Sequence, residues 1–170
     1  LDLDGAFTQD GPGLVALAAD IRTSEDLVSL NGPVTLTGNV AVDTGTGPGD
    51  FTPAADLSGD GAAYDLSITT GEGNVTFGGT VAGNTGVVDA SVDAVTVSTT
   101  AGSVTFGAAV APVGNVGAVT VTTDSGTITA SGTIAAAGDV ASISMTTTAG
   151  TVTFAETIAS QGNVGPVDID

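Results

Sequence analysis

The fold is decided by three consecutive segments of equal length, which read VTVSTTAGSVTFGAAVAPVGNVGA (95–118), VTVTTDSGTITASGTIAAAGDVAS (119–142) and ISMTTTAGTVTFAETIASQGNVGP (143–166). Apolar residues return at the same places in each segment, and a fixed period of this kind is the signature of a repeat architecture. The repeating positions are Val95, Val119, Ile143 and Val167; Val97, Val121, Met145 and Ile169; Val104, Ile128 and Val152; Val110, Ile134 and Ile158; and Val116, Val140 and Val164.

Within each segment the apolar residues alternate with Thr or Ser, as in VTV (95–97), VTF (104–106) and TIT (127–129). This period of two is typical of β-strands with one buried face. Three short strands, separated by corners such as TTAG and GN, make one turn of a parallel β-solenoid, whose turns stack roughly 4.8 Å apart. The sequence therefore predicts an all-β chain, with about seven turns of about 24 residues each.

The repeat extends toward the N-terminus with changes of length. Leu66 and Val75 keep the internal offset of the later segments, and Phe7 is the earliest equivalent. We therefore predict a single solenoid domain over 1–170, with irregular turns in 1–65, an insertion at 83–92 and regular repeats in 95–170. The only helix-like run is LVALAADI (14–21), which lacks a clean cap.

A column of glycines accompanies the repeat. In six of seven units a glycine lies two residues before the apolar position that Phe7 begins, and Asp26 holds the seventh place. Because glycine tolerates positive φ, we interpret this column as a tight corner. Its members are Gly5, Gly49, Gly73, Gly102, Gly126 and Gly150.

The composition excludes several classes of function. The 170 residues include 19 acidic side chains and one basic side chain, Arg22, for a formal net charge of −18, with no His, Cys or Trp. There is thus no thiol nucleophile, imidazole base or disulfide. Nucleic acid is a poor partner because binding it requires basic charge, and an anionic membrane surface is disfavoured for the same reason. No run of 18 apolar residues could cross a membrane.

An enzymatic role is also disfavoured. Lyases and hydrolases that act on polysaccharides from a β-helix need basic residues or a paired acid and base with aromatic platforms, and this chain has one Arg, one Tyr and no Trp. We expect no enzymatic activity and no cofactor. The chain begins at Leu1 without a recognisable signal peptide, and we interpret it as a piece of a longer precursor.

Several strings resemble the filamentous-haemagglutinin-like and related β-strand-repeat giant bacterial surface adhesins. They are AFTQDGPG (6–13), VTLTGNVAVDTG (34–45), GNVTFGGTV (73–81), AGSVTFGAAV (101–110) and AGTVTFAETI (149–158). The resemblance lies in the style of the repeat. It implies a right-handed parallel β-helix, an extracellular location at the cell surface, and a role in attachment, biofilm matrix or fibres. It supplies no catalytic residue.

Local concentrations of carboxylates are the candidate metal ligands. Asp2 and Asp4 lie near one terminus and Asp168 and Asp170 near the other, and Ca²⁺ is the hard cation that such oxygens could hold. Asp56, Asp60 and Asp65 form a third concentration. The alternative is that outward Asp keeps the molecule soluble and discourages edge pairing.

Hydroxyl ladders are the second candidate for a binding surface. If the turns stack in register, Ser67, Thr96, Thr120 and Ser144 form one outward row and Thr69, Ser98, Thr122 and Thr146 the next. A second sheet would carry Thr76, Thr105, Thr129 and Thr153. Such rows resemble ice-binding surfaces, but Thr also suits any exposed strand.

Polar residues at the corners are the third candidate for ligand contacts. We expect Asn39, Asn115, Asp139 and Asn163 to satisfy backbone groups at the corners. Asn74-Val75-Thr76 matches the N-glycosylation sequon.

Two hypotheses for function follow. The first is a structural and adhesive solenoid module of a secreted bacterial surface or matrix protein, forming a stiff rod or fibre. The second is a solenoid that binds Ca²⁺, a glycan or ice through its acidic clusters or Thr rows. The insertions near 44–65 and 84–92 favour the first. We also expect like units to continue the solenoid end to end, covalently or by association, through Leu1, Leu3 and Phe7 at one end and Val167 and Ile169 at the other.

Overall fold

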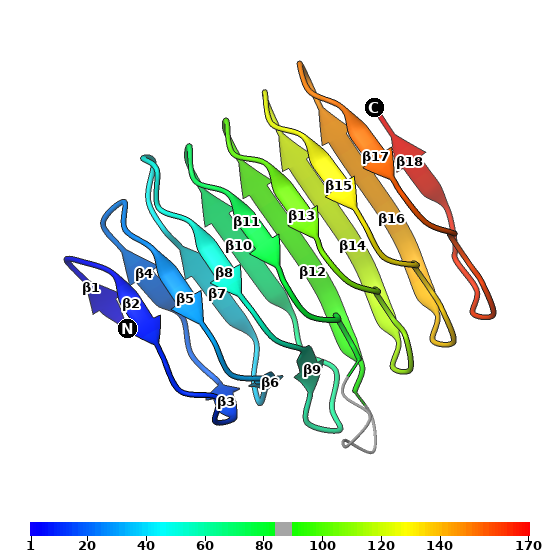
Figure 1. The fold of residues 1–170 in the computed structure, drawn as a ribbon, viewed down its shortest axis with the longest axis horizontal. Helices are drawn as coiled ribbons and strands as arrows, with labels where there is room; N and C mark the ends of the chain where they lie inside the picture. The colour runs from blue at the N-terminus through cyan, green and yellow to red at the C-terminus, as the bar shows by residue number, and fades with distance from the viewer. Residues whose placement is uncertain (84–89) are drawn as a thin grey trace.

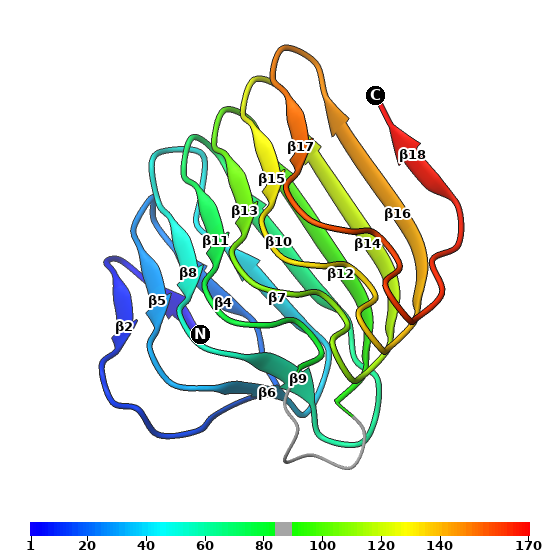
Figure 2. The same cartoon turned by 45° about the vertical axis from the view of Figure 1, so that its right-hand side comes forward.

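The chain coils into a stack of turns whose strands form three parallel sheets, here named A, B and C (Figure 1). The computed structural model describes residues 1–83 and 90–170, so the centre of the predicted insertion, 84–89, lies outside the described residues. The strands of sheet A run upward behind those of sheet B, which run downward, and successive turns advance to the right (Figures 1 and 2). The coil is therefore right-handed, as the resemblance implied, and the predicted all-β solenoid of about seven turns is confirmed.

The strands divide among the sheets as follows. Sheet A contains β1 (Asp2–Leu3), β4 (Ile21–Thr23), β7 (Val40–Asp43), β10 (Leu66–Thr70), β12 (Val92–Thr99), β14 (Val116–Thr123), β16 (Val140–Thr147) and β18 (Val167–Ile169). Sheet B contains β2 (Phe7–Gln9), β5 (Val28–Leu30), β8 (Phe51–Pro53), β11 (Val75–Phe77), β13 (Val104–Phe106), β15 (Ile128–Ala130) and β17 (Val152–Phe154). Sheet C contains β3 (Val15–Leu17), β6 (Val34–Leu36) and β9 (Leu57–Gly59).

The predicted stacking register is confirmed. Val119 pairs with Val95 below it and Ile143 above it, and Ile143 pairs in turn with Val167. The irregular turns obey the same register, since Val28 lies between Phe7 and Phe51. Equivalent residues therefore stack on one another although the turns differ in length.

The third strand of each turn is shorter than the repeat predicted. Among the described residues sheet C is confined to the first three turns, and from Val81 onward single bridges through Val110, Ile134 and Ile158 replace it. Each bridging residue is followed by an alanine with positive φ, between 51° and 61°, which turns the chain and prevents a longer strand. These alanines are Ala82, Ala111, Ala135 and Ala159.

The helix-like run at 14–21 is not a helix. Val15–Leu17 is strand β3 and Ile21 opens β4. Leu17 and Ile21 are buried, whereas Leu14 is 65% exposed. Stacking on the next turn, through the pairing of Val15 with Val34, overrides the local helical tendency.

One continuous apolar core fills the solenoid from Leu17 to Met145. Phe77 and Phe106 stack with ring centroids 4.9 Å apart and planes 2° apart. Ala130 lies between Phe106 and Phe154 in the same column, as the repeat predicted.

The glycine column does form a corner, but positive φ, the predicted reason for glycine there, is wrong. Of the six glycines only Gly5 has a positive φ, of 149°. A β-carbon built on Gly102 or Gly126 would instead overlap the carbonyl oxygen of the glycine one turn below. The column is glycine because the stacked corners approach each other closely, and the positive φ that recurs from turn to turn belongs to alanine.

A column of threonines, all buried except the half-buried Thr147, closes the same corner and was not among the candidates from the sequence. Its hydroxyls bond the corner backbone: Thr70 Oγ1 donates to the Gly73 carbonyl at 2.7 Å, and Thr123 Oγ1 accepts from the Gly126 N–H at 3.0 Å. Thr123 also donates to the Gly102 carbonyl, one turn below, at 3.1 Å. The column contains Thr23, Thr44, Thr70, Thr99, Thr123 and Thr147.

We predict that Val119→Asp destabilises the fold by about 4 kcal/mol, because it buries an unpaired charge in the core. Val119 is only 2% exposed. Thr120→Asp, on the outward side of the same strand, should change stability by less than about 1 kcal/mol. Chemical denaturation of both variants measures the difference; equal losses would contradict the strand register.

We predict that Thr123→Val costs about 2 kcal/mol, because it removes the acceptor of the buried Gly126 N–H and one of the two threonine hydroxyls that donate to the Gly102 carbonyl. The neighbouring exposed residue supplies the control, since Thr122→Val removes a hydroxyl that faces solvent. Urea denaturation should separate the two variants. A Thr123→Val protein as stable as the wild type would show that the column only fills space.

Candidate functional site

The four aspartates predicted as Ca²⁺ ligands lie at opposite ends of the molecule. Asp2 belongs to β1 and Asp168 to β18, and these are the two outermost strands of sheet A (Figure 1). All four side chains are exposed. A single chain therefore does not bring the two pairs together. Within 1–83 and 90–170, no group of three or more Asp or Glu side chains is arranged to hold a metal ion.

In the third acidic concentration the carboxylates of Asp56 and Asp60 accept hydrogen bonds, and Asp65 contributes its backbone N–H. Asp56 Oδ1 accepts hydrogen bonds from the Thr80 N–H at 2.9 Å and the Thr80 hydroxyl at 2.7 Å. Asp60 Oδ1 accepts from the Ala62 N–H at 3.3 Å, while Asp65 donates its own N–H to Asn39 Oδ1 at 3.0 Å. These groups tie loops and turns to one another.

The residues predicted to form the assembly ends are core positions without a neighbouring turn. Leu1, Val167 and Ile169 are 58%, 43% and 46% exposed, while Met145, which pairs with Ile169, is 1% exposed. Leu3 and Phe7 are half-buried. A further strand on either end would cover these side chains.

The strand register of sheet A shows which residues of the two ends occupy the same column. Because Asp2 pairs with Arg22, Leu1 lies opposite Ile21. The inward column that contains Ile21 ends at Ile169. Asp170 follows Ile169 and therefore falls in the outward column of Asp2. A copy added in this register would set Asp2 next to Asp170, so the two carboxylates would repel each other.

The corner asparagines act as the sequence analysis expected. Asn115 Oδ1 accepts from the Asp139 N–H at 2.8 Å, and Asp139 Oδ1 accepts from the Asn163 N–H at 2.7 Å. Each side chain thus bonds the backbone one turn further along. The sequon residue Asn74 takes part in a similar ladder, because its Oδ1 accepts from the Ser103 N–H at 2.9 Å.

Both predicted sets of hydroxyl rows are present. In sheet A, Thr96 pairs with Ser67 and Thr120, and Ser98 with Thr69 and Thr122. In sheet B, Thr105 pairs with Thr76 and Thr129. The sheet B row is longer than predicted, because Thr8, Ser29 and Thr52 extend it through the irregular turns. These three residues directly follow Phe7, Val28 and Phe51, which the glycine column already marks as equivalents, so the same column in the sequence is the signal that extends the row.

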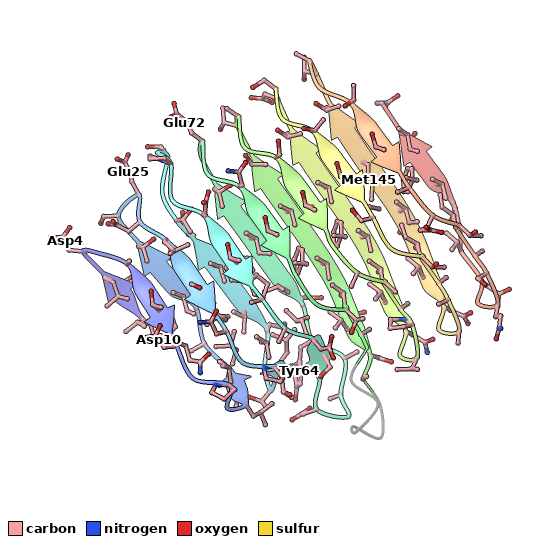
Figure 3. All side chains as sticks on the ribbon, in the orientation of Figure 1. Asp4, Asp10, Glu25, Tyr64, Glu72 and Met145 are labelled. Carbon is pink, nitrogen blue, oxygen red and sulfur yellow. The ribbon has the colours of Figure 1, made fainter. Side chains whose placement is uncertain are left out.

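Acidic residues cluster at the corners rather than on sheet B. Asp4, Glu25 and Glu72 project from the corner where sheet A leads into sheet B (Figure 3). None of the seven described strands of sheet B contains a charged residue. Sheet B therefore presents an uncharged, hydroxyl-bearing surface on a strongly acidic molecule.

Comparisons of the chain with protein-family models, curated proteins and solved structures found no match. Among the described residues there is no helix long and apolar enough to cross a membrane.

We predict that Ca²⁺ and Mg²⁺ at equal ionic strength raise the melting temperature equally, because both screen the repulsion within a chain of charge −18. Differential scanning calorimetry in chelated buffer, with each ion added in turn, measures the effect. A shift specific to micromolar Ca²⁺ that disappears in Asp168→Asn with Asp170→Asn would instead establish a calcium site.

Proposed function

We propose that this chain is a structural and adhesive module, a stiff segment of a secreted bacterial surface or extracellular-matrix protein. The observation that carries the proposal is the continuous core from Leu17 to Met145, enclosed by sheets in which strands pair only with those of neighbouring turns. Such a molecule is built in one dimension and lengthens by adding turns.

The hydrogen bonds between turns support a mechanical role. The Val104 N–H donates to the Thr127 carbonyl and the Ile128 N–H to the Thr151 carbonyl, each at 2.9 Å. Sheets A and B lie on opposite sides of the core along most of the stack (Figure 2). Bending the stack would lengthen bonds in one sheet and compress the packed core beneath the other, so the segment resists bending.

Charge and ends fit the same role. Corner carboxylates keep a Thr- and Val-rich solenoid soluble. A like unit associated end to end would cover Leu1, Val167 and Ile169 once cations screen the carboxylates of Asp2 and Asp170. The resemblance of the repeat strings to giant surface adhesins supports the extracellular location. No step of this function requires a catalytic residue or a cofactor.

Immunogold electron microscopy of the cells that make the protein tests the proposal. We expect label along fibres on the cell surface or in the matrix, and atomic force microscopy of the purified native protein should show straight segments. Label confined to the cell interior would contradict the location. Flexible, bead-like particles would contradict the mechanical role.

A further inference from the structure

Sheet B carries an unbroken outward row of seven hydroxyl residues, here called the hydroxyl column. The flanking strand positions point inward, so each strand presents one hydroxyl to solvent. In the described part of the chain none of these seven hydroxyls has a hydrogen-bond partner in the protein. The column contains Thr8, Ser29, Thr52, Thr76, Thr105, Thr129 and Thr153.

The acidic charge is unevenly distributed along the stack. The only acidic residues between 95 and 165 are Asp124, Asp139 and Glu156. The segment 1–65 is much more acidic, with Asp2, Asp4, Asp10, Asp20, Glu25, Asp26, Asp43, Asp50, Asp56, Asp60 and Asp65. Of these, Asp10 and Asp50 border the hydroxyl column, and both belong to its N-terminal half.

We propose that sheet B is the contact surface between two copies of this chain, packed side by side and antiparallel. Two molecules of charge −18 repel each other, so their approach is least opposed through a surface with few carboxylates; no strand of sheet B contains one, and Asp10 and Asp50 lie only at its border. The antiparallel arrangement sets the acidic N-terminal turns of one copy against the nearly neutral C-terminal turns of the other.

The hydroxyl column supplies the contacts of this interface. Sheets pack face to face about 10 Å apart, a distance at which outward side chains of the two copies interdigitate. Threonine contributes a methyl group for packing and a hydroxyl for bonds across the interface. Thr76 is the fourth of seven members, so the two-fold axis of an antiparallel pair passes beside it and Thr76 faces its own mate.

The size of the surface indicates a weak pairing for a single unit. Seven strands at about 4.8 Å, each of three residues at about 3.3 Å, cover on the order of 330 Å² on each copy. The total of roughly 670 Å² is smaller than the area that a stable specific interface buries. The inference deepens the proposed function and rests on it, because a weak contact repeated along a long solenoid becomes strong through multivalency and thickens a rod into a fibre.

Disulfide trapping tests the inference, and because the protein contains no natural cysteine, only the introduced cysteines can form a disulfide. Under mild oxidation Thr76→Cys should form a covalent dimer at least ten times faster than Thr120→Cys. Thr120 is the matched control, since it is equally half-exposed but lies outward on sheet A. A mixture of Thr8→Cys and Thr153→Cys should form the mixed dimer in preference to either self-dimer.

Equal trapping of Thr76→Cys and Thr120→Cys would overturn the interface. Preferential self-dimers of Thr8→Cys and Thr153→Cys would indicate parallel packing and overturn the arrangement. Sedimentation equilibrium adds a second measurement, in which Thr76→Asp should weaken association at least tenfold and Thr120→Asp should not. Equal association of these two variants would also count against sheet B. None of these results depends on where the protein is found, so failure here leaves the immunogold test standing.

Discussion

The structure depends on one constraint, which is that the backbone of each turn lies directly on the backbone of the turn below. Strand pairing fixes this separation at roughly 4.8 Å, and every residue must then tolerate its equivalent as a neighbour. Inside, this selects columns of Val, Ile and Phe. At the corner between sheets A and B it selects glycine, because no β-carbon fits above the carbonyl of the turn below, and threonine, whose hydroxyl donates to that carbonyl.

The strand register could be predicted from the sequence because equivalent positions in successive turns of a solenoid require similar residues. Val95, Val119 and Ile143 were identified by spacing alone, and their pairing is the observed one. The parts that spacing could not reveal are those where length varies. Ile21 and Val42 pair in sheet A, but their turn is shorter than the regular repeat and the first of them lies within a helix-like run. The positive φ at Ala111 and Ala135 was equally hidden, since alanine, unlike glycine, is not a residue type that signals positive φ in a sequence.

The candidate sites also divide into those that the sequence could predict and those that it could not. The corner asparagines were interpretable because their bonds are local to one corner and repeat with the turns. The aspartates near the termini were grouped by composition, although the order of residues along a solenoid chain is also their order along the stack and already places Asp2 and Asp168 at opposite ends. Sheet B became visible as a surface only in three dimensions, where Thr8 and Thr153 join the same row in spite of the uneven spacing between them.

The pairing of each strand only with its neighbours has a kinetic consequence. Contacts between turns join residues about 24 positions apart, as at Ser103 and Thr127, and this separation does not grow when turns are added. The relative contact order therefore falls as the chain lengthens, although the sheets are parallel. A long array can begin to order as soon as two turns have emerged into an aqueous compartment, and each later turn then adds to an existing edge. Chain length, which slows the folding of most parallel β-proteins, is no obstacle to this one.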